Sequence, residues 1–320
     1  VSLLGRPDIA VYTNVRPVHL ENFQSLRHIA EAKAELLAGV ADDGTMIANA
    51  DDAEVMRIAE RFRDERGGRL VTYATQQAAD VTASDPKPLA NGEFRVGSRF
   101  TLHAAGTTRV IELPLHGLYN IENFLAAAAC ALTVAMDEGL AVDQALDDIV
   151  AGAAELVPSS MRGEVHRTAH GPTLIDDSYN SNPDAAARAL ESARLLPATR
   201  RVAILGDMLE LGPDAAEYHR RVGKRAAELG FDLVVAVGRL AKHLEPGVVD
   251  AGGRALWLED ADAVIAWLAE SPRLGERPLG RGDLVLVKGS RGVGLDAVVR
   301  ALLDRYDDAP TTAATAGKEA

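Results

Sequence analysis

Cysteine, aromatic residues and long apolar runs are scarce in this chain of 320 residues. Its single cysteine, Cys130, excludes a disulfide within the chain and favours a reducing, cytoplasmic environment. The longest apolar run, residues 124–136, is shorter than the roughly 20 residues that cross a bilayer, and it predicts a buried helix without a membrane role. Basic residues are outnumbered, and the net charge of −13 argues against nucleic acid or an anionic membrane as a partner.

The sequence also lacks a Walker A loop, in which glycine amides and a lysine hold nucleotide phosphates. That loop needs a glycine, four residues and then Gly-Lys-Ser/Thr, but the Gly-Lys pairs at 223–224 and 317–318 are followed by arginine and glutamate. The chain opens with Val1 instead of methionine, and residues 1–7 show no targeting pattern. We therefore expect a fragment of a longer protein.

Length and composition indicate a globular protein with two α/β domains. With 47% apolar and 25% charged residues, 320 residues can bury two separate cores. Apolar strand-like runs alternate with helical patterns, which predicts parallel sheets joined by helical crossovers. Short β-like runs at 94–96, 99–103 and 109–113 instead predict antiparallel hairpins at the edge of the first sheet.

The helical pattern stops near residues 157–160, where we place the domain boundary. The predicted domains are therefore 1–158 and 159–306, and the Thr/Ala-rich segment 307–320 is expected to be a disordered tail. The first domain is predicted to contain strands at 9–15, 45–48 and 70–73 and helices at 25–40, 53–63, 121–136 and 142–153. The second, a doubly wound sheet, is predicted to contain strands at 173–176, 201–205, 232–237, 254–258 and 283–287 and helices at 184–195, 214–229, 239–244, 260–269 and 293–305.

Polar residues follow the first strand of the second domain. Two aspartates, Asp176 and Asp177, and two asparagines, Asn180 and Asn182, lie on this strand-to-helix turn. Open α/β sheets bind ligands beyond the carboxyl ends of their strands, so these side chains are candidates for substrate contact. Asp177 is equally well explained as an Asx-turn or helix cap, and the asparagines as residues that shape the turn.

A histidine and a lysine near the first predicted strand form a second candidate site. His19, on the loop after that strand, suits a metal ligand, a capping group or a solvated side chain, and Lys33 suits an exposed helix position. Asn120 is a plausible N-cap of the long apolar helix, and Asn123 lies one turn further on. Carboxamides both donate and accept, which matches the polar edge of adenine.

Two cationic segments complete the candidate residues. Arg162 lies at the predicted domain junction, where it suits either phosphate binding or a solvated linker. The loop with Lys288, Ser290 and Arg291 joins a strand to a helix and offers backbone donors and cations to an anion. The alternative for this loop is that Lys288 and Arg291 are ordinary surface charges.

The motifs at 175–183 and 206–212 together resemble those of the Mur ligase family, and the resemblance covers nearly all of residues 6–305. It implies that 1–158 is the C-terminal part of the family's central, parallel-sheet ATP-binding domain. It also implies that 159–306 is the Rossmann-like C-terminal domain. The motif at 206–212 points to the family member that uses ATP to join D-alanyl-D-alanine to UDP-N-acetylmuramoyl-tripeptide through an acyl phosphate.

The resemblance also implies roles for the candidate residues. It implies that His19 binds Mg²⁺ and that Lys33 is carbamylated, which would give Mg²⁺ the oxygen ligands it prefers. Asn120 and Asn123 would contact the nucleotide base, Arg162 the ATP phosphate and Asp177 the ribose. The nearby residues Asn180, Asn182, Lys288, Ser290 and Arg291 would face the peptide substrates.

One residue departs from the family pattern: Tyr119 stands where many relatives have histidine. This departure leaves open a related ligase with another acceptor. The missing Walker A loop leaves open a non-catalytic protein that binds a nucleotide or cell-wall precursor. We expect a monomer. Without a phosphate loop, the chain by itself is expected to be inactive.

Overall fold

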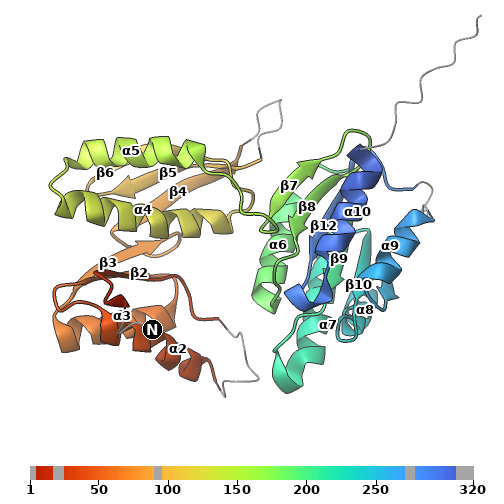
Figure 1. Ribbon diagram of the computed structural model, residues 1–320, viewed down its shortest axis with the longest axis horizontal. Helices are drawn as coiled ribbons and strands as arrows, with labels where there is room; N and C mark the ends of the chain where they lie inside the picture. The colour runs from red at the N-terminus through yellow and green to blue at the C-terminus, as the bar shows by residue number, and fades with distance from the viewer. Residues whose placement is uncertain (1–4, 17–24, 90–95, 271–277, 308–320) are drawn as a thin grey trace, which may run out of the picture. The chain divides into compact units, whose positions relative to one another are not determined.

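The computed structural model describes residues 5–16, 25–89, 96–270 and 278–307, which form α/β structure throughout (Figure 1). The chain divides into two compact units, Val1–Glu164 with Glu210–Ala215, and Val165–Leu209 with Ala216–Ala320. Each unit contains one six-stranded sheet. The predicted class, two sheets of the α/β type joined in sequence, is confirmed.

The sheet of the first unit has its strands in sequence order, from β1 to β6. β1, β2, β3 and β4 pair in parallel, whereas β4, β5 and β6 pair antiparallel. The strands are β1 (Ile9–Tyr12), β2 (Thr45–Asn49), β3 (Arg69–Ala74), β4 (Val81–Pro88), β5 (Ser98–Ala104) and β6 (Thr107–Leu113). The helical segments are α2 (Leu26–Ala34), a 3₁₀ turn at Glu35–Gly39, α3 (Ala53–Arg66), α4 (Tyr119–Asp137) and α5 (Val142–Glu155).

Helices cover both faces of this sheet, which explains why its central strands are almost wholly apolar. On β2, Met46 and Ala48 pack with α2 and α3, while Ile47 points to the opposite face and packs with α4 and α5. By length and composition, one helix of the described chain, α4, could cross a membrane. Many of its side chains, including Phe124 and Leu125, are instead buried in the core of this unit, as predicted for residues 124–136.

The predicted edge hairpin is confirmed at β5 and β6, and residues 90–95 lie outside the described part of the chain. The sequence analysis missed β4, because Pro86 and the polar run around it argue against a strand. β4 tolerates these residues because its register shifts between Ser84 and Lys87. The first predicted strand was too long, since β1 ends at Tyr12.

The sheet of the second unit has the order β11-β10-β9-β12-β8-β7. The strands from β11 to β8 are parallel. The strands are β7 (Glu164–Arg167), β8 (Thr173–Asp177), β9 (Arg200–Gly206), β10 (Leu233–Val237), β11 (Ala255–Leu258) and β12 (Asp283–Lys288). The helices are α6 (Pro183–Leu195), α7 (Ala215–Glu228), α8 (Leu244–Asp250), α9 (Ala261–Ala269) and α10 (Asp296–Asp307), with 3₁₀ turns at Gly212–Asp214, Ala241–His243 and Arg291–Val293.

The order of these strands confirms the predicted doubly wound sheet. The chain passes from β8 to β9 across the position of β12, and then continues outward to β10 and β11. Three adjacent strands, β9, β12 and β8, therefore bring their carboxyl ends to one edge, the usual place for a ligand in such sheets. The division between the two units falls within β7, whose pairing with β8 places the strand in the second sheet.

Two elements of the second unit differ from the sequence prediction. The helix predicted at 239–244 is a 3₁₀ turn at Ala241–His243, followed by the unpredicted helix α8. Pro246 and Gly247 lie within α8, and their presence argued against a helix there. The edge strand β7 was also missed, because four residues with two charges give no strand periodicity.

Candidate functional site

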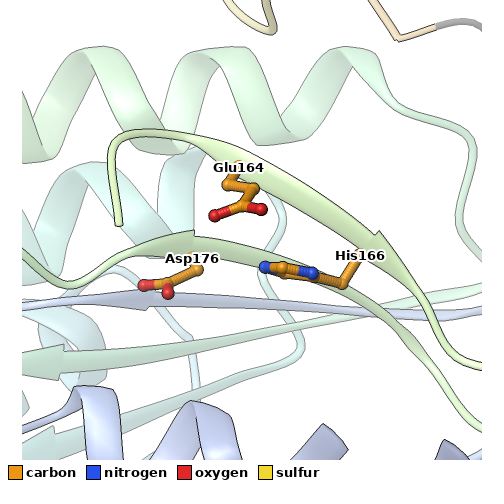
Figure 2. Close-up of side chains that lie close together, drawn as sticks. All are labelled: Glu164, His166 and Asp176. Carbon is orange, nitrogen blue, oxygen red and sulfur yellow. The ribbon is translucent and has the colours of Figure 1, made fainter. Parts of the chain in front are cut away.

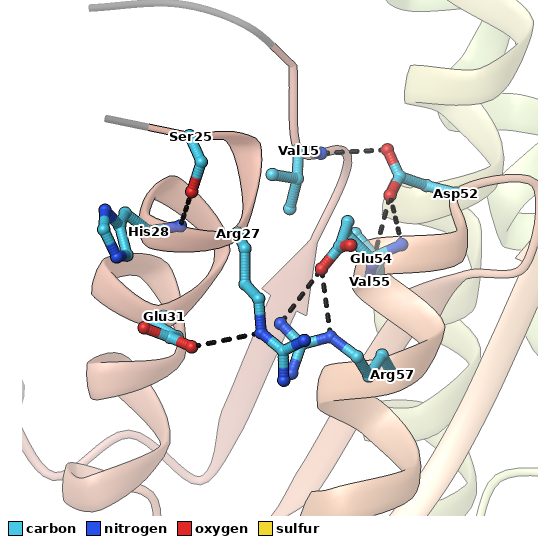
Figure 3. Close-up of polar contacts among 9 residues, drawn as sticks. All are labelled: Val15, Ser25, Arg27, His28, Glu31, Asp52, Glu54, Val55 and Arg57. Atoms are coloured by element: carbon cyan, nitrogen blue, oxygen red, sulfur yellow. Dashed lines mark hydrogen bonds and ion pairs between the residues drawn. The ribbon is translucent and has the colours of Figure 1, made fainter. Parts of the chain in front are cut away.

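The carboxyl end of β1 in the first unit is held in place by a buried carboxylate (Figure 3). The Oδ1 atom of Asp52 caps α3 by accepting from the backbone N–H groups of Glu54 and Val55, at 3.1 and 3.0 Å. Its Oδ2 atom accepts from the backbone N–H of Val15, at 2.9 Å. One side chain thus fixes both the exit of β1 and the start of α3, and sequence reasoning did not identify it.

Helix α2 follows the loop after β1 and carries one of the predicted metal ligands. Ser25 caps α2 through its hydroxyl, which accepts from the backbone N–H of His28 at 3.3 Å (Figure 3). Lys33 lies in the last turn and is exposed, and its backbone carbonyl accepts from the Tyr12 hydroxyl at 2.8 Å. His28 is exposed, and His19 lies outside the described residues.

The two predicted nucleotide-binding asparagines lie on the first turn of α4 and contact each other. The Asn123 amide donates to Asn120 Oδ1 at 3.2 Å. The predicted N-cap role of Asn120 is wrong, because α4 begins at Tyr119 and Leu118 occupies the cap position. The Asn120 amide instead donates to the backbone carbonyl of His116 at 2.6 Å, so the side chain joins the helix to the preceding loop.

His116 is a buried histidine directly before this helix. Its side chain is 7% exposed, and among the described residues its Nε2 atom has no hydrogen-bond partner. Burial lowers the pKa of the imidazole to about 4, because the charged form would lose its hydration. The ring is therefore neutral at physiological pH.

The ends of β3 and β1 lie close together, and both strands contact α4. The Tyr73 hydroxyl is 3.4 Å from the backbone oxygen of Tyr12. Burial is the main cause that raises the pKa of Tyr73, and the negative charges of Glu122, Asp52 and Asp51 act in the same direction. Asn120 and Asn123 flank Glu122, so the asparagines lie near the carboxyl edge of the first sheet.

Arg162 is brought close to the same helix through its neighbour Gly163. Gly163 has a φ of +73°, and a Cβ atom added there would lie 2.6 Å from the Tyr119 hydroxyl. Only glycine fits this contact without strain. Two candidates that are 42 positions apart in sequence, Asn120 and the exposed Arg162, therefore lie on segments in direct contact.

In the second unit, Asp177 and Lys288 form a nearly buried ion pair at the carboxyl edge of the sheet. The Lys288 Nζ atom lies 2.8 Å from Asp177 Oδ2, and the side chains are 3% and 15% exposed. Nζ also donates to the backbone carbonyl of Asn180 at 2.8 Å. Lys288 is therefore no surface charge, and the alternative that it is solvated is wrong.

The turn after β8 is shaped by Asp176 and Asn182. Asp176 Oδ1 accepts from the backbone N–H and hydroxyl of Ser178, at 3.1 and 2.6 Å, which forms an Asx-turn. Asn182 Oδ1 caps α6 by accepting from the backbone N–H of Ala185 at 2.9 Å. The cap role considered for Asp177 is thus wrong, because Asn182 caps α6, and the Asp177 carboxylate pairs with Lys288.

Ser290 links the three strand ends. Its backbone N–H donates to the Asp207 carbonyl at 2.9 Å, and its hydroxyl oxygen accepts from the backbone N–H of Leu209 at 3.0 Å. The hydroxyl also lies 3.4 Å from the backbone oxygen of Ser181. Ser290 is 5% exposed. By contrast, Arg291 has an exposed side chain, 3.9 Å from Asp296.

Asp207 and His219 give the 206–212 motif a structural role that the sequence alone did not reveal. Asp207 Oδ1 accepts from the backbone N–H groups of Leu240 and Ala241, at 2.9 and 2.6 Å. The fully buried His219 accepts at Nε2 from the backbone N–H of Met208, at 2.9 Å. The carboxyl end of β9 is therefore fixed on both sides.

The positions of Asn182, Lys288 and Ser290 limit how these residues can meet a ligand. All three side chains already bond within the protein, so direct substrate contact would have to replace one of those bonds. Asn180 and Arg291 are exposed, although Asn180 Oδ1 accepts from the backbone N–H of Ser181 at 2.8 Å and Arg291 pairs with Asp296 at 3.9 Å. The structure thus assembles Asp177, Asn180, Lys288, Ser290 and Arg291 at one edge of the second sheet.

Two family models match the chain in sequence order. The Mur ligase middle domain matches residues 1–131, and the Mur ligase glutamate ligase domain matches residues 161–291. The UDP-N-acetylmuramoyl-tripeptide–D-alanyl-D-alanine ligase of Mycobacterium tuberculosis is 35% identical over 94% of this chain and 59% of its own length. The Escherichia coli ligase of the same name is 33% identical over 93% of this chain and 61% of its own length.

Solved structures show the same fold. MurF from Acinetobacter baumannii superimposes with a TM-score of 0.77 at 25% identity, over 95% of this chain and 61% of that one. MurF ligase from Thermotoga maritima, in complex with ADP, superimposes with a TM-score of 0.77 at 22% identity, over 96% of this chain and 64% of that one. The chain thus spans about three fifths of the length of the curated relatives described above, at 59% and 61%.

Proposed function

Because the chain belongs to the Mur ligase family, we propose that it supplies part of the ATP site and the C-terminal domain of an amide ligase that joins D-alanyl-D-alanine to UDP-N-acetylmuramoyl-tripeptide. The observation that carries this proposal is that ligases of that name match 94% and 93% of this chain, at 35% and 33% identity. We place the activity in the cytoplasm, in a monomer.

The first unit is proposed to bind the nucleotide. Asn120 and Asn123 are proposed to contact the base of ATP, and Arg162 its phosphates, where planar guanidinium donors match phosphate oxygens. The contact between Gly163 and Tyr119, which places the Arg162 segment beside the asparagines, supports this assignment. The ADP complex of the Thermotoga relative agrees with a nucleotide site in this fold.

Mg²⁺ is the metal proposed to accompany ATP, with His19 and a carbamylated Lys33 as ligands. Lys33 is exposed and makes no side-chain hydrogen bond or ion pair within the described part of the chain, so a carbamate has room there. Carbamate oxygens suit Mg²⁺, and the chemistry that Mg²⁺ supplies is neutralisation of charge on phosphate oxygens.

The second unit is proposed to contribute Asp177 to the ribose and the 288–291 loop to the peptide substrates. Lys288 supports both tasks, since it holds the Asp177 carboxylate and the Asn180 carbonyl at once. Ser290 fixes the loop backbone. We propose that Arg291, which is exposed, meets a substrate carboxylate.

The test is phosphate release by the protein expressed from its complete gene, with ATP, Mg²⁺, UDP-N-acetylmuramoyl-tripeptide and D-alanyl-D-alanine. The proposal requires release that depends on both peptide substrates. Arg291→Ala should raise the KM for a peptide substrate. Arg300→Ala is the matched control, because Arg300 is also exposed and also pairs with Asp296, at 3.1 Å.

Other outcomes would assign a different function. Release with the same precursor but another amine would indicate a related ligase with a different acceptor. Nucleotide or precursor binding without any release would indicate a non-catalytic binding protein. Equal effects of Arg291→Ala and Arg300→Ala would remove Arg291 from the substrate site.

A further inference from the structure

Three potential metal ligands meet at the edge of the second sheet, in the strand pair β7–β8. Glu164 and His166 are two positions apart on β7, so their side chains lie on the same face of the strand. Asp176 lies on β8, the strand to which β7 is hydrogen-bonded. One ligand atom from each residue lies within 4.8 Å of the other two. Figure 2 shows Glu164 and His166 directed from β7 toward β8, where Asp176 lies.

Asp176 has one carboxylate oxygen that could bind a cation. It is 5% exposed, and its Oδ1 atom is used by the Asx-turn with Ser178. Its Oδ2 atom has no hydrogen bond or ion pair recorded within the described ranges of the chain. Oδ2 is not among the fully buried polar atoms of the described chain that lack a partner, so it is accessible to water or to an ion.

The identity of the three ligands selects a class of metal. An imidazole nitrogen with two carboxylates suits Zn²⁺ and similar divalent transition metals, whereas Mg²⁺ and Ca²⁺ prefer oxygen alone. Tetrahedral ligands with bonds of about 2.0–2.2 Å lie roughly 3.3–3.6 Å from one another. The three ligand atoms lie within 4.8 Å of one another, so side-chain movements of about 1 Å or little more would bring them to tetrahedral spacing.

We propose that Glu164, His166 and Asp176 form a binding site for a divalent transition metal, with a fourth position open to water. Glu164 and His166 are only partly buried, so an ion can reach the site. The metal would join β7 to β8 and fix the carboxylate that holds Ser178. Ser178 follows Asp177, so occupancy would also order the turn that carries the buried ion pair with Lys288.

Zn²⁺ is the probe for this site. The 320-residue chain, freed of metal by chelation, is titrated with Zn²⁺ in competition with a chromogenic chelator. The proposal requires one equivalent of bound Zn²⁺, a rise in the melting temperature, and visible absorption bands when Co²⁺ replaces Zn²⁺. Each of Glu164→Gln and His166→Ala should weaken binding on the order of tenfold or more.

His170→Ala is the matched control, because His170 is exposed, lies near the same strand and is outside the group of three. The proposal fails if the wild type binds no stoichiometric Zn²⁺, or if His166→Ala and His170→Ala bind alike. Should Asp176→Asn prevent folding, Glu164→Gln keeps the test decisive, since this residue is only partly buried. Metal binding is measured without turnover, so the result is separate from that of the ligase assay.

Discussion

Lys288 and Asp177 occupy opposite positions in the parallel pairing of β12 with β8, and their side chains meet at 2.8 Å with almost no access to water. Two strands that are far apart in sequence are thus joined at the edge where the candidate residues gather. The lysine also holds the Asn180 carbonyl. A buried charge of this kind is tolerated because both the carboxylate and the carbonyl compensate it.

Replacing Asp177 should lower the free energy of unfolding more than replacing Lys288. Asp177→Asn leaves the Lys288 ammonium buried without its counter-charge, and should lower the free energy of unfolding by roughly 3 kcal/mol. Lys288→Met leaves Asp177, which has some access to water, and should cost less. The double variant should recover part of the loss from Asp177→Asn. Urea unfolding measures all three.

Arg291→Ala is the control for this series, because the Arg291–Asp296 pair is exposed and 3.9 Å long. This change should leave the free energy of unfolding within about 0.5 kcal/mol of the wild type. A loss from Asp177→Asn no larger than that would show that the buried pair does not stabilise the second unit.

Asn182 should stabilise the start of α6 through a single hydrogen bond. Asn182→Ala removes the acceptor for the Ala185 N–H and should lower the free energy of unfolding by about 1 kcal/mol. Asn182→Asp keeps an acceptor and adds a negative charge at the helix N-terminus, so it should preserve stability. Thermal unfolding of the two variants compares them directly, and equal melting temperatures would rule out the capping role.

The sequence allowed prediction of most elements, because their apolar periodicity is local. β2, β9 and β12 are short, continuous apolar runs, as expected for strands with helices on both faces. The missed strands β4 and β7 are polar and lie where pairing with a neighbouring strand, and not periodicity, determines the structure. Such pairing is invisible to a local pattern.

The positions of the candidate residues were predictable, but their partners were not. The strand-to-helix turns placed Asp177 and Lys288 at one sheet edge, since parallel strands share their carboxyl ends. The burial of Lys288 depends on its pairing with Asp177 from another strand, so the sequence could not show whether Lys288 is buried or exposed. In the same way, Asn120 was expected to cap α4. Its side-chain amide instead donates to the backbone carbonyl of His116, a partner that the sequence pattern does not reveal.

His116 should make the protein sensitive to acid. Its folded-state pKa is about 4, below the ordinary value of 6.5, so the unfolded chain binds a proton first as the pH falls. Stability is therefore complete above about pH 6.5 and is lost as the pH falls toward 4. Between pH 7 and pH 5 this histidine alone should remove about 2 kcal/mol from the free energy of unfolding.

His116→Gln removes the titrating group, so its free energy of unfolding should change less between pH 7 and pH 5 than that of the wild type. His170→Ala serves as the control, because His170 is exposed and should leave the wild-type difference intact. Urea unfolding at the two pH values provides the comparison. An unchanged pH difference in His116→Gln would mean that other groups cause the acid sensitivity.

Gly163 should be irreplaceable because of both its backbone and its neighbour. Gly163→Ala places a Cβ atom 2.6 Å from the Tyr119 hydroxyl at a φ of +73°. Gly106 has a similar φ of +76° but no atom within 4 Å, so Gly106→Ala isolates the backbone strain, about 1 kcal/mol. Gly163→Ala should cost roughly twice that or more, because the clash adds to the strain.

Tyr119→Phe removes the clashing hydroxyl, so it should rescue much of the excess cost of Gly163→Ala without affecting Gly106→Ala. The free energies of unfolding of the single and double variants measure this coupling directly. Equal losses from Gly163→Ala and Gly106→Ala would show that the Tyr119 contact does not hold the Arg162 segment. A rescue by Tyr119→Phe would instead show that this contact sets the position of Arg162 beside Asn120 and Asn123.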